Sequence, residues 1–242
     1  MPNALKECLK KSALLTSLVR AVRRNWLWPR RRRSVVDAYF AKHTVLKLHL
    51  GTGPDFLLDG WLASDLNPHY DRGIVYLDAT QPFPFDDRAF DYVFSEHQIE
   101  HLTYPEGLLM LQECFRVLKP AGKLRLATPD LKVYLDLFKP DLSDQQQRYI
   151  RYHVDKFLPG LALYHPALVL NNEARNWGHQ FLYDAPTLED ALKKAGFVAL
   201  KRYASGESDD PNLKGIEFHG KVVKNEEMNA FETMVFEAQR PA

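Results

Sequence analysis

The chain has 242 residues, which is enough for one large domain or two small ones. With 45% hydrophobic, 12% aromatic and 26% charged residues it has the composition of an ordinary globular protein, which excludes a fibrous or wholly disordered chain. The two cysteines, Cys8 and Cys114, are too few for a disulfide framework or a cysteine-rich zinc site, and this favours a reducing, cytoplasmic environment.

The net charge of +1 conceals an asymmetry between the first 33 residues and the rest. Residues 1–33 hold ten Lys and Arg and one acid, whereas the remainder holds 22 basic and 30 acidic residues. Apolar residues recur at three- and four-residue steps between positions 3 and 26, which predicts a basic amphipathic helix, and residues 30–33, four arginines, are interpreted as a solvated linker. We therefore divide the chain into a basic extension, 1–33, and a domain, 34–242.

The basic extension favours contact with an anionic membrane surface, because a basic amphipathic helix can lie among lipid headgroups. Packing on the domain or on another subunit, or a targeting role, would use the same composition. Nucleic acid is disfavoured as a partner, because the acidic domain would repel phosphate. Since no apolar run reaches the ~20 residues of a membrane span, we expect a cytoplasmic protein, peripheral at the inner face of a membrane if the extension binds lipid. The oligomeric state stays open.

From residue 34 onward the pattern is that of an α/β domain. A short helix is predicted near 35–42, and a longer one at 104–118 begins with a capping box formed by Thr103 and Glu106. Short apolar runs bounded by turn residues predict buried parallel strands. These predicted strands are residues 45–50, 61–65, 74–77, 91–95 and 123–127.

After these elements the pattern becomes helical and irregular at about 130–183, which we interpret as an insertion. Its aromatic residues suit either a lid over a polar substrate or an internal core. They are Tyr149, Tyr152, His153, Tyr164 and His165. A helix at 186–196 and strands at 198–203 and 230–237 are predicted to follow, and the alternation of strands and helices predicts a doubly wound sheet.

The first predicted strand runs directly into Gly51, Thr52 and Gly53. In a parallel sheet this turn lies at the ligand-binding crevice, and glycines let the backbone approach a ligand closely. Asp65, which closes the second strand, is placed to accept hydrogen bonds from a ribose diol, and Asp78 after the third strand from an adenine amine. Each feature taken alone could equally be an ordinary turn.

Several segments together resemble the class I S-adenosylmethionine-dependent methyltransferases, particularly the small bacterial predicted methyltransferases of the methyltransferase domain 11 type. These segments are LHLGTG at 48–53, Asp65, PFPF at 82–85, FDYV at 90–93 and LKPAGKL at 118–124. The resemblance is strong over 45–127 and less specific over 176–237. It implies a Rossmann-like, mostly parallel seven-stranded sheet with an antiparallel last strand, S-adenosylmethionine as cofactor and S-adenosylhomocysteine as product.

The resemblance also implies which residues border the cofactor: Gly51, Thr52 and Gly53 at the methionine part, Asp65 and Leu66 at the ribose, Asp78 and Ala79 at the adenine, and Ser95, Glu96 and His97 near the sulfonium. Thr52 and Ala121 depart from the residues that the family often has at these positions. A nicotinamide dehydrogenase is disfavoured, because Phe56 stands where its motif requires a third small residue.

Methyl transfer needs a base only if the acceptor must lose a proton. The candidate catalytic residues are His179, His97 and Glu96. His97 and His101 could share a face of a helix, but no third ligand is placed by the sequence, so we expect no metal. His179 could be a base or a structural tether. We predict a methyltransferase for an unidentified acceptor, a sugar or another small polar molecule. The alternative is a non-catalytic cofactor-binding or scaffold protein with the same fold.

Overall fold

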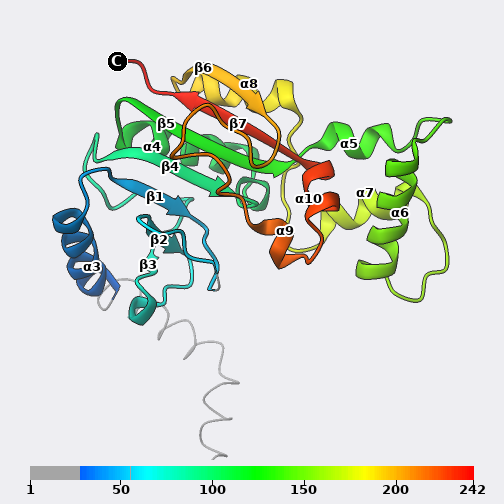
Figure 1. Ribbon diagram of the computed structural model, residues 1–242, viewed down its shortest axis with the longest axis horizontal. Helices are drawn as coiled ribbons and strands as arrows, with labels where there is room; N and C mark the ends of the chain where they lie inside the picture. Colours follow the sequence, from blue (N-terminus) through cyan, green and yellow to red (C-terminus); the bar gives the residue numbers. More distant parts are fainter. Residues whose placement is uncertain (1–27, 55) are drawn as a thin grey trace, which may run out of the picture.

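The structure of the protein is a computed structural model that describes residues 28–54 and 56–242, and its centre is a single twisted β-sheet (Figure 1). Seven strands pair in the order β3-β2-β1-β4-β5-β7-β6. The pairings from β3 to β5 are parallel, and β7 runs antiparallel to both of its neighbours. The strands are β1 Lys47–Leu50, β2 Leu62–Asp65, β3 Val75–Tyr76, β4 Phe90–Glu96, β5 Leu118–Pro129, β6 Val198–Tyr203 and β7 Thr233–Gln239. The expected sheet, mostly parallel with an antiparallel last strand, is confirmed.

The order of the strands reverses beside β1, because β2 lies on one side of it and β4 on the other. Leu50, the last residue of β1, is in register with Ser64 of β2 and with Ser95 of β4. The carboxyl ends of the three strands therefore meet at one edge of the sheet. In open α/β sheets this reversal point is where ligands bind.

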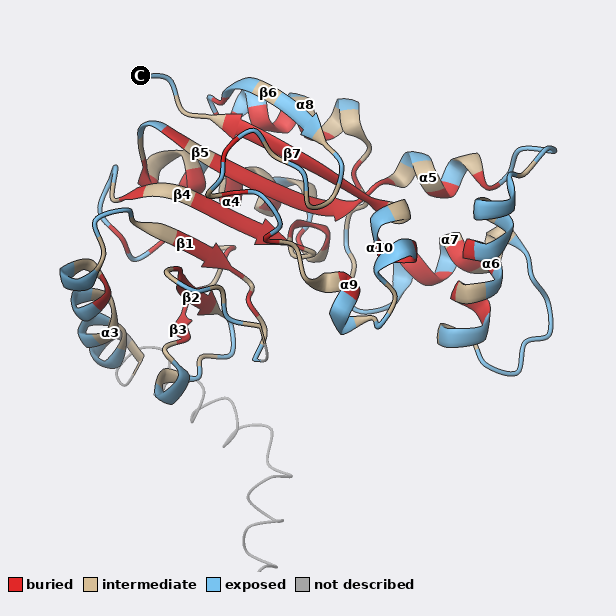
Figure 2. Ribbon diagram, viewed as in Figure 1, coloured by how far each residue is buried: buried red, intermediate tan, exposed pale blue. Residues whose placement is uncertain are grey.

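Three helices cover one face of the sheet: α3 Trp28–Lys42, α4 Tyr104–Val117 and α8 Ala185–Lys194. They share one hydrophobic core with the inward-facing residues of the strands, which appear red in Figure 2. The predicted capping box of α4 is present, because Glu106 accepts hydrogen bonds from the backbone N–H and the hydroxyl of Thr103. Met110, Leu111 and Cys114 form the buried stripe of this helix.

The opposite face of the sheet is covered by the long connection that follows β6. Leu213 and Ile216 from this connection pack on Phe94 and Trp61. Arg125 of β5 is fully buried on this face and is paired with Glu217 and Glu237. Hydrophobic contacts and a buried ion pair therefore hold the connection, which leads into α9 His219–Val222 and α10 Glu226–Glu232.

The predicted insertion forms a separate cluster at one end of the sheet, beside α10 (Figure 1). It contains α5 Leu131–Asp136, α6 Asp144–Phe157 and α7 Pro166–Arg175. Tyr149 and His153 are buried in it, whereas Tyr164 is exposed. The two ends of the insertion meet where the backbone N–H of Leu131 donates to the carbonyl oxygen of Tyr183.

Two expectations about local structure are wrong. Residues 30–33 are not a linker but part of α3, which begins at Trp28. The ring of Trp28 packs at a tilt against that of Tyr76, with centroids 4.6 Å apart. The last strand begins at Thr233 and not at residue 230, because α10 continues to Glu232.

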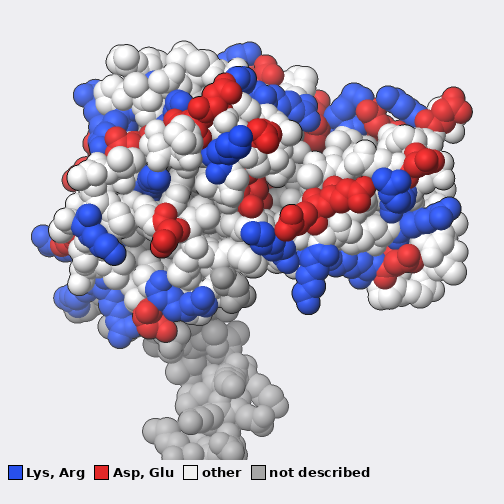
Figure 3. Space-filling view, in the orientation of Figure 1, with Lys and Arg blue, Asp and Glu red and all other residues white. Residues whose placement is uncertain are grey.

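The proposed amphipathic helix at 3–26 lies outside the described residues, so its role stays a prediction. Within the described ranges, no helix is both long enough and apolar enough to cross a membrane. Basic and acidic side chains are interspersed on the face drawn in Figure 3.

Candidate active site

The glycine turn after β1 and the aspartate after β2 are joined by a hydrogen bond. The backbone N–H of Gly53 donates to Oδ2 of Asp65 at 3.0 Å, and the N–H of Asn67 donates to Oδ1 at 2.7 Å. Gly51 and Gly53 have φ angles of 67° and 60°, which L-residues with side chains rarely adopt. A Cβ atom on Gly51 would come within 2.8 Å of the Gln98 side chain, whereas one on Gly53 would meet nothing within 4 Å.

This arrangement fits the adenosyl part of the expected cofactor. The turn leaves open space beside Gly53, so the backbone can approach a ligand. The carboxylate of Asp65 has lone pairs beyond those used by the two backbone amides, since a carboxylate offers about four acceptor sites. The predicted neighbours Gly51, Gly53 and Asp65 are therefore brought together.

The other residues expected to border the cofactor's methionine, ribose and adenine parts differ in burial and in hydrogen bonding. Thr52 is buried and donates its hydroxyl to the carbonyl of Gly53. Leu66 is 55% exposed beside Asp65. Asp78 accepts from the backbone N–H and the hydroxyl of Thr80, and so completes a turn after β3, and Ala79 is buried in the main core. Their contact with a cofactor stays a prediction.

The end of β4 carries the next three predicted residues. Ser95 donates its hydroxyl to the side-chain carbonyl of Gln98 at 3.0 Å. The carboxylate of Glu96 accepts from the backbone N–H groups of Phe218 and His219, each at 3.0 Å. Burial raises the pKa of Glu96. Glu96 thereby fixes the start of α9 against β4, which is a positioning role that the sequence pattern did not suggest.

His97 uses both of its ring nitrogens. Nδ1 lies 3.2 Å from Oε1 of Glu100, and Nε2 lies 3.1 Å from the hydroxyl of Thr233. Its ring stacks on that of His219, with centroids 3.9 Å apart. Burial alone would lower the pKa of His97, but the carboxylate of Glu100 raises it overall.

A cavity of about 280 Å³ opens beside these residues, past the ends of β4 and β5. Its walls come from the ends of β4, β5 and α6, the 3-10 turn Ile99–His101, α7 with the segment after it, α9 and the end of α10. The polar lining includes His97, Glu100, His101, His179 and His219. Two of the three predicted catalytic residues, His97 and His179, therefore share one cavity.

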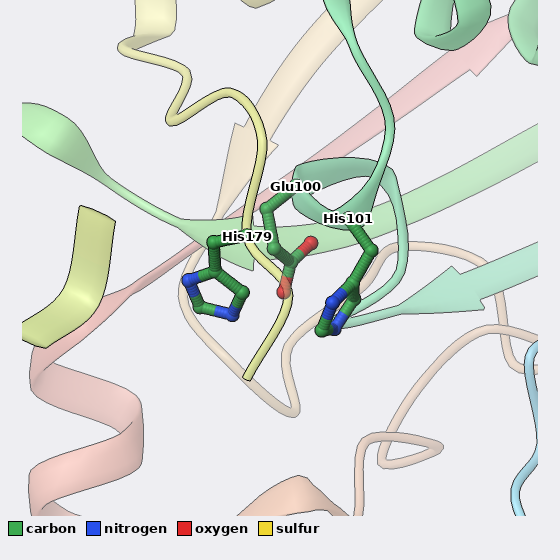
Figure 4. A group of neighbouring side chains, drawn as sticks. All are labelled: Glu100, His101 and His179. Atoms are coloured by element: carbon green, nitrogen blue, oxygen red, sulfur yellow. The ribbon is translucent and has the colours of Figure 1, made fainter. Parts of the chain in front are cut away.

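The ring of His179 is oriented by a hydrogen bond to a backbone carbonyl. Its Nδ1 lies 2.6 Å from the carbonyl oxygen of Glu173, so this nitrogen carries the proton and donates it. The ring of His179 lies beside that of His101, with centroids 4.8 Å apart. In Figure 4 the carboxylate of Glu100 lies between the two imidazoles. Burial lowers the pKa of His179.

Several features of the cavity were missed by the sequence analysis. Neither Glu100 nor His219 was among the predicted catalytic residues. Glu173 and Glu232 are further acids on the wall, and burial raises the pKa of each. No sequence spacing links residues this far apart; only the fold places them together.

Comparison with known proteins agrees with the α/β fold. Residues 62–126, from β2 to β5, match the family model described as a methyltransferase domain. This part of the chain is similar to a methyltransferase domain. The resemblance to class I S-adenosylmethionine-dependent methyltransferases is thus confirmed, and the matched residues lie within the part of the chain that carried it.

Relatives of the methyltransferase domain are distant. The demethylmenaquinone methyltransferase of Lactococcus lactis is 28% identical over 123 residues, which are 51% of this chain and 44% of that protein. The match therefore spans less than half the length of that relative. Among solved structures, a SAM-dependent methyltransferase from Archaeoglobus fulgidus is 17% identical and covers 98% of each chain with a TM-score of 0.47. A putative methyltransferase from Bacillus halodurans is 16% identical and covers 87% of this chain and 99% of that chain, with a TM-score of 0.45.

Proposed function

We propose that the protein is an enzyme that uses S-adenosylmethionine to methylate a small polar acceptor. The observation that carries the proposal is the hydrogen bond between Gly53 and Asp65, which joins two cofactor-binding elements at the reversal point of a methyltransferase-domain sheet. The cavity lined by His97 and His179 lies at the same edge of the sheet, past the end of β4.

The cofactor, when bound, supplies a methyl group already activated on a sulfonium. Gly51 and Gly53 would admit its methionine part, and Asp65 would accept hydrogen bonds from its ribose. Asp78 and Ala79 would border the adenine. Ser95, Glu96 and His97 would lie near the sulfonium, since they end the strand beside β1. Catalysis by positioning then requires only that the acceptor be held in line with the methyl group.

The cavity supports a small acceptor. Its volume of about 280 Å³ is near the lower end of the range for small-molecule sites. Its polar groups, chiefly imidazoles and carboxyl groups, suit a hydroxyl- or amine-bearing acceptor such as a sugar. His179 is the best placed base, because its Nδ1 is engaged by the carbonyl of Glu173 while Nε2 lies on the side of Glu100 and His101 (Figure 4).

Binding of the cofactor is tested by calorimetry with S-adenosylmethionine and S-adenosylhomocysteine. We expect micromolar binding by the wild-type protein, and a loss of about 1–3 kcal/mol in Asp65→Ala, because the ribose hydroxyls lose a charged acceptor. Asp59→Ala is the matched control, since Asp59 is an exposed aspartate in the connection between β1 and β2. No binding by the wild type would refute the proposal, and equal binding by Asp65→Ala would refute the location of the site.

Turnover is tested with cofactor that carries a labelled methyl group and with fractionated cell extract. A labelled small molecule that requires active protein supports the enzyme. Cofactor binding without any labelled product would favour the competing function, a binding or scaffold protein that retains the fold.

A further inference from the structure

The cavity contains a group of side chains of the types that bind transition metals. Glu100, His101 and His179 each place one ligand atom so that all three atoms lie within 4.8 Å of one another. Figure 4 shows the three side chains converging from the 3-10 turn after β4 and from the segment after α7. In a tetrahedral site with bonds of about 2.1 Å, ligand atoms lie about 3.4 Å apart, so small side-chain rotations would close the group around an ion.

Hydrogen bonds orient the side chains of His179 and Glu100 as ligands. Nδ1–H of His179 donates to the carbonyl oxygen of Glu173, and this leaves Nε2 as the nitrogen with a free lone pair. Metal-bound histidines commonly donate their other N–H to a carbonyl or carboxylate in this way. Oε2 of Glu100 accepts from the hydroxyl of Thr128 at 3.0 Å. Oε1 of the same buried carboxylate lies 3.2 Å from Nδ1 of His97 and has no further hydrogen-bond partner among the described residues.

The two segments that carry these side chains are locked to each other. The backbone N–H groups of Gln180 and Phe181 both donate to the carbonyl oxygen of Glu100, at 2.7 and 3.2 Å. His179 is therefore tied at its neighbour to the residue that supplies the carboxylate. A site formed in this way is rigid before an ion arrives, which lowers the entropic cost of binding.

We propose that Glu100, His101 and His179 form a binding site for a first-row divalent transition metal ion, of which Zn²⁺ is the representative. Two imidazoles and one carboxylate are a donor set that suits such ions and leaves coordination positions open. These positions would face the cavity, where an acceptor oxygen or nitrogen can bind the ion. Binding of the acceptor rests on the proposed function, whereas binding of the ion does not. With the ion bound, Nε2 of His179 is a ligand and no longer acts as the base.

The competing explanation is an ion pair between His97 and Glu100. In that case Glu100 is satisfied by His97 and Thr128, and the imidazoles of His101 and His179 only pack in the cavity wall. The two explanations differ in whether the protein binds an ion with stoichiometric affinity through all three side chains.

The experiment uses the full chain without a histidine tag, freed of metal with a chelator and titrated with Zn²⁺ by calorimetry and with Co²⁺ by visible absorption. We expect one ion per chain and Co²⁺ bands typical of nitrogen and oxygen ligands. Glu100→Gln, His101→Ala and His179→Ala should each weaken binding at least tenfold, because even changes to residues behind the ligands cost 10- to 100-fold. His69→Ala, which alters an exposed histidine between β2 and β3, should bind as the wild type does.

Absence of stoichiometric binding by the wild type overturns the proposal, and so does unchanged affinity in all three variants. Circular dichroism of each variant shows whether it is folded, and His101→Ala is the safest variant because His101 is only partly buried. Binding of S-adenosylhomocysteine is measured on the same wild-type sample. Metal binding without cofactor binding would refute the proposed function and leave the metal site supported. Cofactor binding without metal binding would refute the metal site and leave the proposed function supported.

Discussion

The two sides of the ligand-binding edge are built in different ways. On one side, the turn at Gly51 and Gly53 meets Asp65, and the whole arrangement lies within 15 consecutive residues. On the other side, the histidine cavity takes its lining from many separate elements of the chain between His97 and Glu232.

This difference determines what each side depends on. The glycine turn depends on backbone conformation that neighbouring strands impose, so a short motif is enough to specify it. The cavity depends on long-range contacts that bring α9, α10 and the insertion onto the end of the sheet. Substitutions that weaken distant contacts should therefore damage the cavity first, whereas the turn should respond chiefly to local changes.

The largest effect is expected from Arg125→Met. Arg125 is fully buried, and its loss leaves Glu217 and Glu237 without their cation, which should destabilise the fold by about 3–5 kcal/mol. Glu217 precedes the residues that Glu96 holds at the start of α9, so the cavity wall should loosen as well. Denaturant unfolding measures the loss of stability.

Lys119→Met is the control for Arg125→Met. Lys119 is on β5, as Arg125 is, and its substitution removes a partly exposed ion pair with Asp91 of β4. Such pairs contribute about 0–1 kcal/mol. Similar losses in the two variants would contradict the view that the buried pair anchors this face of the sheet.

A smaller, pH-dependent effect is expected at His49, which precedes the glycine turn. His49 is fully buried without a hydrogen-bond partner among the described residues, and burial lowers its pKa to about 3. The unfolded chain takes up a proton at about pH 6.5, so stability is full above that pH and falls as the pH drops from 6.5 towards 3. At pH 5 the loss from this residue should be about 2 kcal/mol.

His49→Leu should remove that part of the pH dependence, because leucine does not titrate. Unfolding free energies at pH 7.5 and pH 5 measure it for both proteins, with His69→Leu as an exposed control. An unchanged difference between the two pH values in His49→Leu would show that other groups cause the loss.

The smallest effect is expected from Gly51→Ala, compared with Gly60→Ala. Both glycines have positive φ, so both substitutions carry the same backbone cost of about 1–2 kcal/mol. Only the new methyl group on Gly51 meets the Gln98 side chain; that on Gly60 meets nothing within 4 Å. We therefore expect Gly51→Ala alone to weaken S-adenosylhomocysteine binding about tenfold, or about 1.4 kcal/mol, by calorimetry. Equal affinities would show that the turn does not contact the cofactor.

Much of the fold follows from local pattern. Every predicted strand of the sheet is present, and α4 begins at its predicted capping box, because apolar periodicity and capping are encoded in neighbouring residues. The expectation of a linker at residues 30–33 was wrong because tertiary contacts fix the start of the helix that contains them. The ring of Trp28 packs against that of Tyr76, and the hydroxyl of Tyr70 donates to the Trp28 carbonyl. Charge alone does not reveal such contacts.

The two sides of the site also differ in how far the sequence could predict them. The sequence alone placed Gly51, Gly53 and Asp65 correctly relative to one another, because a parallel sheet fixes where consecutive strand ends lie. It named His97 and His179 but could not place His179 beside His101, 78 residues earlier. The expectation that no metal binds rested on the lack of a third ligand, and the proposed titration tests it against the group formed by Glu100, His101 and His179.

The closure of the insertion by the hydrogen bond from Leu131 to Tyr183 has a consequence for how this protein could diversify. Because its ends are adjacent, the intervening segment could be exchanged for another in evolution or in the laboratory with little disturbance of the sheet. His179 belongs to the exchangeable segment, whereas Glu100 and His101 belong to the fixed one. Exchange of this one segment would therefore alter the shape of the acceptor cavity. It would also remove or restore His179, one of the three proposed metal ligands.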